Sequence, residues 1–376
     1  MRFFSSLNRF VLPGLAFKAV VIGGGYATGR ELVEFFMPSG PVGGLYGMAL
    51  AMAFWSLVCA LTFLLAFKLR AYDYQSFFRA LLGRFDFAFE IVYFANVILV
   101  LAVFGSAAGA IGAALLSAPL IAGTLLLVFA VLAVCAAGQG AAEAVFKYVS
   151  VLLYGVYTIF LALSLWSFTP QIAQGFQIPV PATGWIAGGL TYASYNVIGA
   201  VLILPVLRHL KSERDAIVSG LLAGPLAMVP AIVFFVCLVA FYPRVLGEAL
   251  PSDYVLTALH QPIFHILFQL MVFFALLECS VGFVQAFNAR VDVHNAKRGR
   301  TTPQWLRLLV TGSLTFGSVF IASTIGLVAL IATGYRAMAY AVMAIFLLPL
   351  FTIGLVRIAE LRRSGRGGAL VDQPAE

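Results

Sequence analysis

Long apolar runs dominate the pattern of hydrophobic and polar positions along this chain. About 20 mostly apolar residues are enough to cross a bilayer as a helix, and the sequence contains ten such runs. They lie at approximately 9–37, 41–68, 88–113, 117–137, 140–168, 184–208, 214–241, 262–289, 303–322 and 334–358. The pattern predicts an all-α integral membrane protein with ten transmembrane helices in a single transmembrane domain that covers residues 1–376.

Three segments outside these runs carry signals of their own. Residues Asp73 to Phe85 mix apolar and polar positions at helical spacing, which predicts a helix lying in the membrane interface. The segment from Tyr242 to Gln261 is the longest connection on its side of the membrane. Residues 362–376 are polar and rich in glycine, which predicts a flexible cytoplasmic tail.

The composition excludes the other broad classes of protein. Of the 376 residues, 62% are hydrophobic and only 10% are charged, whereas soluble domains average about 25% charged residues. Too few charges remain to cover a water-soluble globule. A soluble, disordered or fibrous protein is therefore excluded.

The net charge of +8 indicates how the chain is oriented in the membrane. Most of the 23 basic residues fall at the ends of the predicted helices that share a side with the N-terminus, and only Arg244 and Arg336 fall on the opposite side. This bias follows the positive-inside rule. It predicts a multi-pass protein of the plasma (inner) membrane with both termini in the cytoplasm. Because the basic residues are spread over separate connections, we expect no nucleic-acid partner.

No motif for catalysis or metal binding is present in the sequence. The four cysteines lie in apolar runs, without the spacing of a metal site or of an exported disulfide. The chain has no phosphate-binding motif of the G-x-x-x-x-G-K-[ST] type. We therefore expect no enzyme, no metal site and no cofactor, apart from Na⁺ or H⁺ as a coupling ion.

Two of the ten runs are poor continuous helices. In the first, residues 23–29 (GGGYATG) contain four glycines, and each interior glycine costs up to about 1 kcal/mol relative to alanine. In the sixth, residues 188–199 (GGLTYASYNVIG) mix glycine with polar and β-branched residues. One explanation is that the glycines only let helices pack closely. Interruptions at corresponding places in two halves instead indicate a transporter site.

The spacing of the two interruptions predicts an internal repeat. They open the first and second groups of five helices, so the halves are expected at about 9–168 and 184–358. Because five is odd, the second half must be inverted in the membrane relative to the first. The predicted arrangement is a 5+5 inverted repeat.

These features resemble a known superfamily. Ten helices with the first and sixth broken resemble the LeuT-type fold of the amino acid–polyamine–organocation superfamily. Within it, the stretch GGGYATGRELVEFF resembles the opening of the YkvI family of membrane proteins. The resemblance implies alternating access and a small solute bound between the broken helices, but it does not identify the solute.

The broken helices supply the candidate solute-binding groups. Unpaired backbone groups at half-helix ends attract ions and polar solutes, and the sixth run adds hydroxyl, amide and aromatic groups. A mid-helix asparagine on the third run either faces the same cavity or joins two helices. The predicted solute-binding residues are Gly25, Tyr26, Ala27, Thr28, Gly29, Asn96, Tyr192, Ser194, Tyr195 and Asn196.

Glu278 is the leading candidate for ion coupling. It lies in the middle of the eighth run, where a carboxylate is costly and therefore indicates function. A carboxyl group at that depth can bind and release a proton, and a permanently paired glutamate is the alternative. The segment FFALLECS also resembles the eighth helix of sodium-coupled LeuT-type symporters, where two consecutive hydroxyl side chains ligate sodium. Glu278 and Cys279 occupy those positions here, followed by Ser280, and the substitution favours a proton over sodium.

Three further charged residues are candidates for coupling or gating. Lys147 stands four residues after Glu143, a favourable spacing for a helical ion pair, and it resembles the lysine that replaces sodium in proton-coupled relatives. It is equally well explained as a charge at a helix end. Arg30 and Glu31 follow the first interruption and resemble a solute-binding or gating pair, or else they line a wet vestibule.

The leading prediction is a secondary active transporter. It would move a small polar organic solute, such as an amino acid or a related compound, by alternating access coupled to a proton or sodium gradient. One alternative is a sensor or receptor subunit that keeps the fold but does not concentrate its ligand. Another is a facilitator whose flux ignores the ion gradient. The expected partners are the small-molecule solute and the lipid bilayer.

Overall fold

A computed structural model describes residues 2–297 and 301–363 of the chain. The described residues form helices joined by short connections, with no β-strand among them. The tail predicted at 362–376 lies outside the described residues from 364 onward. The prediction of an all-α protein is confirmed.

The first transmembrane segment is interrupted as its glycines predict. It consists of α1 (Arg2–Val21), the four-residue α2 (Gly24–Ala27) and α3 (Arg30–Phe35). Gly29, at the entry to α3, has a φ of 78°, in the left-handed region. Residues other than glycine rarely adopt that conformation, so this turn requires the glycine that the sequence provides.

The sixth segment is also interrupted. It consists of α9 (Trp185–Asn196), α10 (Gly199–Leu202) and the 3₁₀ helix η3 (Leu204–His209). Gly188 allows α9 to approach the first segment, because a Cβ atom at this position would lie 2.0 Å from the carbonyl oxygen of Phe35. The two interrupted segments are therefore in direct contact.

The other segments are long, mostly continuous helices. They are α4 (Gly40–Leu69), α6 (Asp86–Leu116), α7 (Leu120–Ala137), α8 (Gln139–Gln177), α11 (Glu213–Val239), α13 (Pro262–Lys297) and α14 (Gln304–Ile325), followed by a last segment from α15 (Leu327–Ala329) through α16 (Tyr335–Val342) to α17 (Leu355–Arg363). Among the described residues, eight helices are long and apolar enough to cross a membrane. With the two interrupted segments they account for the ten predicted spans.

Two predicted boundaries are wrong. The fifth helix continues to Gln177 rather than ending near 168, with a kink at Phe168, which lies two residues before Pro170. Its last turns are polar, so hydropathy alone ends the run too early. The tenth segment begins at Leu327 rather than 334, directly after Gly326, whose φ is 81°. Residues Leu330–Gly334 are π-helical, so the predicted start at 334 falls inside the helix.

The connections contain two further helices. The predicted interface helix is α5 (Tyr74–Leu82), and its first turn is capped by Asp73, whose carboxylate accepts a 2.8 Å hydrogen bond from the backbone N–H of Ser76. The loop predicted from Tyr242 to Gln261 contains α12 (Pro251–Leu259), which the sequence analysis missed. Proline is favourable at the first position of a helix.

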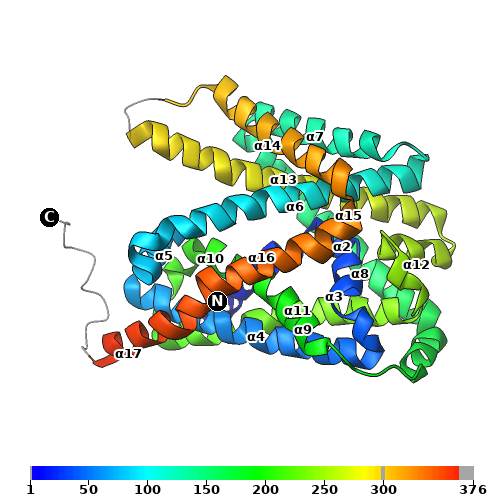
Figure 1. The fold of residues 1–376 in the computed structure, drawn as a ribbon, viewed down its shortest axis with the longest axis horizontal. Helices are drawn as coiled ribbons and strands as arrows, with labels where there is room; N and C mark the ends of the chain where they lie inside the picture. Colours follow the sequence, from blue (N-terminus) through cyan, green and yellow to red (C-terminus); the bar gives the residue numbers. More distant parts are fainter. Residues whose placement is uncertain (1, 298–300, 364–376) are drawn as a thin grey trace.

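The long helices form two groups. In the first, which we call the bundle, α4 packs against α9 and α11, and α1 packs against α11. In the second, the scaffold, α6, α7, α13 and α14 pack against one another. Figure 1 shows α4, α9 and α11 along one edge of the molecule and the scaffold helices along the other. The interruption of the first segment reaches the second group, because α2 packs against α13 and α6.

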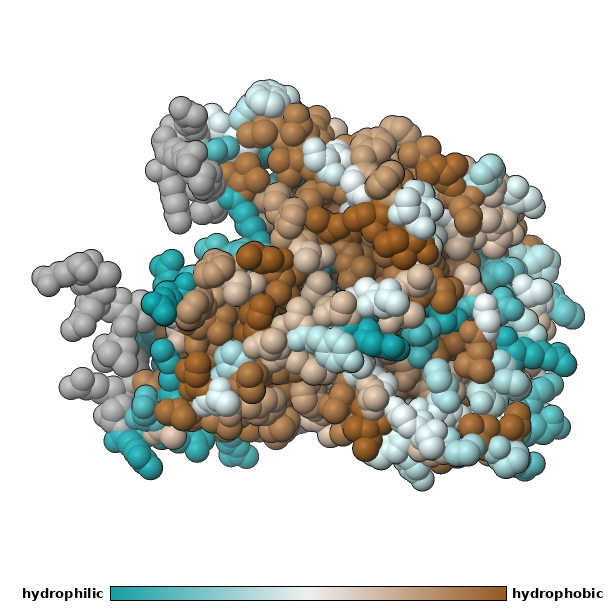
Figure 2. Space-filling model, in the orientation of Figure 1, coloured by the Kyte–Doolittle hydropathy of each residue, from teal (hydrophilic) through white to brown (hydrophobic). Residues whose placement is uncertain are grey.

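The surface is consistent with a protein embedded in lipid. Figure 2 shows hydrophobic residues over most of one face, with hydrophilic residues concentrated toward the two ends of the molecule. One end carries α5 and α17, and the opposite end carries α12 (Figure 1). The first of these ends is the one predicted to face the cytoplasm.

Candidate functional site

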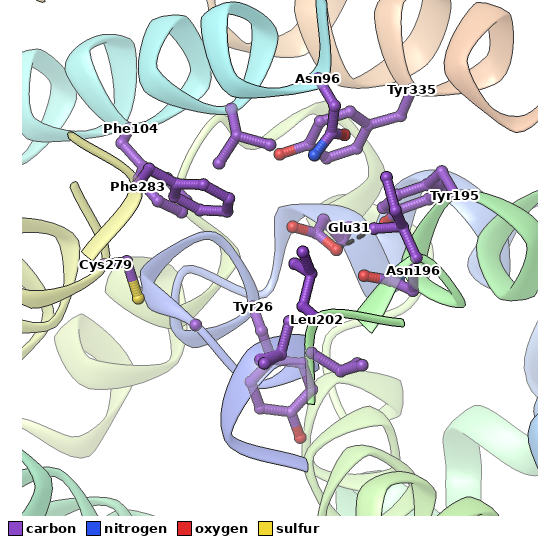
Figure 3. A pocket seen from close by; sticks show the side chains of 15 residues that line it. Tyr26, Glu31, Asn96, Phe104, Tyr195, Asn196, Leu202, Cys279, Phe283 and Tyr335 are labelled. Atoms are coloured by element: carbon purple, nitrogen blue, oxygen red, sulfur yellow. Dashed lines mark hydrogen bonds between the residues drawn. The ribbon is translucent and has the colours of Figure 1, made fainter. Parts of the chain in front are cut away.

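A small central cavity lies between the two interrupted segments. Its volume is about 60 Å³, which is room for a few water molecules. The polar residues of its lining are Tyr26, Glu31, Asn96, Tyr195, Asn196, Cys279 and Tyr335. They come from α2, α3, α6, α9, α13 and α16, so the cavity joins both groups of helices (Figure 3).

Glu31 places a carboxylate in this cavity. Its side chain comes from the first turn of α3, directly after the Gly29 turn, and only 5% of the residue is exposed. The hydroxyl of Tyr195 donates a 2.6 Å hydrogen bond to Glu31 Oε2. The Tyr195 ring in turn stacks on Tyr335, with 4.5 Å between the ring centroids. Glu31 is the only charged residue in the described lining of the cavity.

Two amides face the same space. The side chain of Asn96 extends from α6 with its amide toward the middle of the cavity, beside Tyr335 (Figure 3). Asn196 ends α9, and its Nδ2 donates a 3.1 Å hydrogen bond to the carbonyl oxygen of Tyr192. The Asn196 side chain is therefore held back against its own helix, one turn earlier.

Aromatic and aliphatic side chains line the rest of the cavity. Phe104 from α6 and Phe283 from α13 lie with their ring centroids 6.5 Å apart and both line it. Tyr26 contributes its ring, while its hydroxyl points away from Glu31 (Figure 3) and accepts a 3.1 Å hydrogen bond from Tyr157. The cavity thus offers π faces and a single carboxylate.

Only some of the ten predicted solute-binding residues line the central cavity. Tyr26, Asn96, Tyr195 and Asn196 line the cavity, and the other six are not part of its described lining. Gly25 and Ala27 lie in α2, Gly29 and Thr28 lie at the turn into α3, and Tyr192 and Ser194 are buried in α9. The carbonyl oxygen of Thr28 accepts a 3.0 Å hydrogen bond from the backbone N–H of Ser252, so the interruption is tied to α12.

The predicted gate residues Arg30 and Glu31 point to different places. Arg30 is 4% exposed, and its Nη1 donates to the carbonyl oxygens of Leu246 and Glu248 at 2.9 and 3.0 Å. Its Nη2 donates to Glu34 Oε2 at 2.5 Å. Arg30 therefore anchors α3 to the connection before α12, whereas Glu31 faces the central cavity.

Glu278 lines a second cavity beside the first. This cavity has a volume of about 180 Å³, and its lining includes Tyr154 from α8 and Glu278 from α13. Gly23 and Cys279 line both cavities, so the two spaces are neighbours. The ammonium group of Lys18 lies 4.5 Å from the centroid of the Tyr154 ring.

The other predicted coupling residues lie elsewhere. Ser280 is 1% exposed and does not appear in the described lining of either cavity. Lys147 belongs to α8, but its side chain lies outside the part of the chain that the structure describes. Within residues 2–297 and 301–363, no group of three His, Cys, Asp or Glu residues could hold a metal ion.

Sequence reasoning missed three aromatic residues of the cavity. Phe283 follows Cys279 by one helical turn, so the periodicity of the eighth run could have placed it on the same face. Phe104 stands eight residues after Asn96 on α6, again close to the same face. Tyr335 comes from the distant tenth segment, and no local pattern in the sequence indicates its position.

Comparison with known proteins identifies the fold. No protein-family model matches the chain, and no curated protein matches its sequence. The structure is similar to that of MhsT in complex with L-phenylalanine, with a TM-score of 0.61 and 15% identity over 94% of this chain and 97% of MhsT. It is also similar to the manganese transporter of Eremococcus coleocola in complex with an aromatic bis-isothiourea compound, with a TM-score of 0.55, 13% identity and coverage of 99% and 90%.

These likenesses confirm the fold class predicted from the interrupted helices. The chain is an all-α membrane protein of the LeuT-like fold. The resemblance of GGGYATGRELVEFF to the YkvI family stays a prediction, since no family model matches the chain.

Proposed function

We propose that the protein is a secondary transporter of a small solute that carries an amine group. Two observations support this. The fold is shared with an amino-acid-bound protein, MhsT, and with a manganese transporter. The cavity between the interrupted segments contains one buried carboxylate, Glu31.

The chemistry of the cavity favours an ammonium group. No basic residue in the described lining faces the carboxyl group of Glu31, and a buried charge is stable only when it is paired or well hydrogen-bonded. The rings of Tyr195, Tyr335 and Phe283 offer the π faces that attract cations. An ammonium group that enters the cavity pairs with Glu31 and contacts these rings.

The size of the cavity limits the solute. A volume of about 60 Å³ accommodates about four or five non-hydrogen atoms, judged by the space that a water molecule needs. A small amine or a small amino acid fits this space. For an amino acid, the amide of Asn96 is the group available to receive the carboxylate.

The coupling ion is assigned to the neighbouring cavity. Glu278 and Cys279 occupy consecutive positions on α13 beside the interruption of the first segment, and Gly23 and Cys279 line both cavities. A proton on Glu278, or a sodium ion bound by it, would change the charge next to the solute. The two bodies that would move in alternating access are the bundle and the scaffold.

The observation that carries this proposal is the placement of Glu31 in the central cavity. The test is uptake of radiolabelled small amines and small amino acids into proteoliposomes under an imposed proton or sodium gradient. We expect concentrative uptake by the wild type and none by Glu31→Gln. The matched control is Glu360→Gln, which removes the same charge from an exposed position on α17.

Other outcomes of the uptake experiment would indicate other functions. Ligand binding without flux would replace transport by a sensor role, and downhill flux that ignores the gradient would indicate a facilitator. Full uptake by Glu31→Gln would remove Glu31 from solute recognition.

A further inference from the structure

A large polar cleft lies among three helices of the scaffold, apart from the sites described above. Its volume is about 640 Å³, and we call it the scaffold cleft. Its polar lining residues come from the end of α13, from the connection to α14 and from the start of α14, and the end of α7 with Ala136 closes the third side. They are Gln285, Asn288, Asp292, Thr302, Gln304 and Arg307. No residue of its described lining belongs to the central cavity or to the Glu278 cavity.

The scaffold cleft lies at the level of the lipid headgroups. Figure 1 shows the end of α13 and the start of α14 toward the end of the molecule that carries α5 and α17. Trp305, in the first turn of α14, is 65% exposed, and exposed tryptophan residues are enriched at the membrane–water interface. The cleft therefore opens toward the leaflet that is predicted to face the cytoplasm.

An apolar surface leads from the scaffold cleft toward the middle of the bilayer. On α7, Phe129 lies two helical turns before Ala136 on the same face. The exposed ring of Phe129 meets the exposed ring of Phe316 on α14, with 6.2 Å between the ring centroids. Acyl chains attached to a headgroup in the cleft can pack along these rings. This continuity favours a lipid over a soluble ligand.

Asn288 is the only buried residue in the described lining of the cleft and forms its floor. Its Nδ2 donates a 3.1 Å hydrogen bond to Thr311 Oγ1. The hydroxyl of Thr311 gives its one proton to the carbonyl oxygen of Arg307, 2.8 Å away, so it can only accept from Asn288. Oδ1 of Asn288 is left without a hydrogen-bond partner among the described residues. A buried acceptor of this kind is costly unless a donor reaches it.

The α14 side of the cleft presents hydrogen-bond donors. No side chain caps the N–H groups in the first turn of α14, and such groups attract anions. The hydroxyl of Thr302 accepts a 3.1 Å hydrogen bond from Asn295 and retains its own proton to donate. Arg307 pairs with Asp292 through Nε and Nη2, at 3.2 and 3.0 Å, so Nη1 can donate to another acceptor.

The α13 side presents acceptors, and the cleft as a whole is neutral. Asp292 and Arg307 are the only charged residues in its described lining. Each carboxylate oxygen of Asp292 contacts Arg307 once and can accept a further hydrogen bond. Together with Oδ1 of Asn288, α13 thus offers acceptors where α14 offers donors. A neutral site of this kind fits a zwitterion better than an anion.

We propose that the scaffold cleft binds the headgroup of a phospholipid that carries both a phosphate and a primary ammonium group, as phosphatidylethanolamine does. Arg307 and the first turn of α14 receive the phosphate, and Asp292 and Asn288 receive the ammonium group. A trimethylated ammonium group, as in phosphatidylcholine, has no N–H to donate to these two acceptors. The bound lipid joins the ends of α7, α13 and α14, and this site goes beyond the proposed transport function.

The test measures lipid binding to the purified full-length protein in detergent by native mass spectrometry. The lipids are phosphatidylethanolamine, phosphatidylcholine and phosphatidylglycerol with identical acyl chains, and glycerophosphoethanolamine serves as the soluble headgroup. Arg307→Gln and Asp292→Asn each remove one charge of the cleft. The matched controls are Arg79→Gln and Asp86→Asn, which break a partly exposed ion pair outside the cleft.

We expect the wild type to bind phosphatidylethanolamine about tenfold more tightly than phosphatidylcholine, because hydrogen bonds to charged groups are lost with the methylated headgroup. Arg307→Gln and Asp292→Asn should both lose this preference although they change the charge in opposite directions. Arg79→Gln and Asp86→Asn should keep it. Thermal unfolding without added lipid should be similar for all four variants, because both ion pairs are partly exposed and contribute little.

Three results would overturn this inference. The first is equal affinity of the wild type for phosphatidylethanolamine and phosphatidylcholine. The second is tighter binding of phosphatidylglycerol that Arg307→Gln weakens and Asp292→Asn strengthens, which would indicate a simple anion site. The third is binding of glycerophosphoethanolamine as tight as that of the lipid, which would indicate a soluble ligand. None of these measurements involves uptake, so they leave the proposed role of Glu31 to its own test.

Discussion

The hydroxyl group of Tyr195 on α9 donates a 2.6 Å hydrogen bond to the carboxylate of Glu31 on α3. These two residues come from the two interrupted segments, 164 positions apart in the chain. Their bond orients the carboxylate within the central cavity and joins the two half-helices on which the proposed binding site depends.

Removing this hydroxyl group tests its role in orienting Glu31. Tyr195→Phe keeps the ring that stacks on Tyr335 but deletes the donor. A hydrogen bond to a charged group contributes about 1.5–3 kcal/mol, so we expect the affinity for an amine solute to fall at least about tenfold. Thermal-shift titration measures the change. Tyr340→Phe, at an exposed position on α16, serves as the control, and equal affinities in the two variants would contradict the prediction.

The contact between α9 and α3 makes Gly188 intolerant of a side chain. A Cβ atom at Gly188 would lie 2.0 Å from the carbonyl oxygen of Phe35, and overpacking of this kind costs about 1–3 kcal/mol. We expect Gly188→Ala to lower the thermal unfolding temperature in detergent.

The matched control for Gly188 is Gly312, where an added Cβ atom meets nothing within 4 Å. Gly312→Ala in α14 should be neutral or stabilising by up to about 1 kcal/mol, because alanine favours the helix. The same loss in both variants would show that close packing of α9 on α3 is not the cause.

The ion pair between Lys68 and Glu213 predicts an asymmetric pair of mutants. The Lys68 side chain is 3% exposed, whereas that of Glu213 is 43% exposed. Glu213→Gln leaves the buried ammonium without its carboxylate, and Lys68→Met removes the buried charge itself. We therefore expect Glu213→Gln to destabilise the protein more than Lys68→Met in thermal unfolding. The reverse order would contradict this account, and Arg79→Gln, which breaks an exposed pair, should have little effect.

The assignment of Glu278 to ion coupling gives a functional prediction. In proteoliposomes, Glu278→Gln should abolish gradient-driven accumulation while the protein still folds and still exchanges solute down its own gradient. The physical reason is that the amide neither binds nor releases a proton at this position. Undiminished accumulation by the variant would remove Glu278 from coupling.

The fold could be predicted from the sequence because a bilayer imposes one simple constraint on the chain. Every spanning segment needs a long apolar run, and an interruption such as residues 23–29 is conspicuous within one. The ends of a helix are harder to predict where the helix extends beyond the apolar run that marks it in the sequence. The polar turns after Phe168 and the π-helical stretch through Gly334 are the two examples.

The site could be predicted only in part because its residues come from distant segments. Asn96 and Tyr195 carry polar groups in apolar runs and were recognisable. Glu31 is recognisable as a charged residue, but the direction of its side chain depends on the left-handed turn at Gly29, two residues earlier. Tyr335 approaches from the tenth segment, where no neighbouring residue in the sequence indicates it.

Binding of matched neutral and charged ligands tests the central claim most directly. Purified wild type and Glu31→Gln are titrated with ethanolamine and with ethylene glycol, which replaces the ammonium group by a hydroxyl, and the rise in unfolding temperature is recorded. The account predicts that ethanolamine stabilises the wild type, that ethylene glycol does not, and that Glu31→Gln loses the difference. Equal responses of the two proteins to ethanolamine would contradict the assignment of Glu31 as the group that recognises the solute.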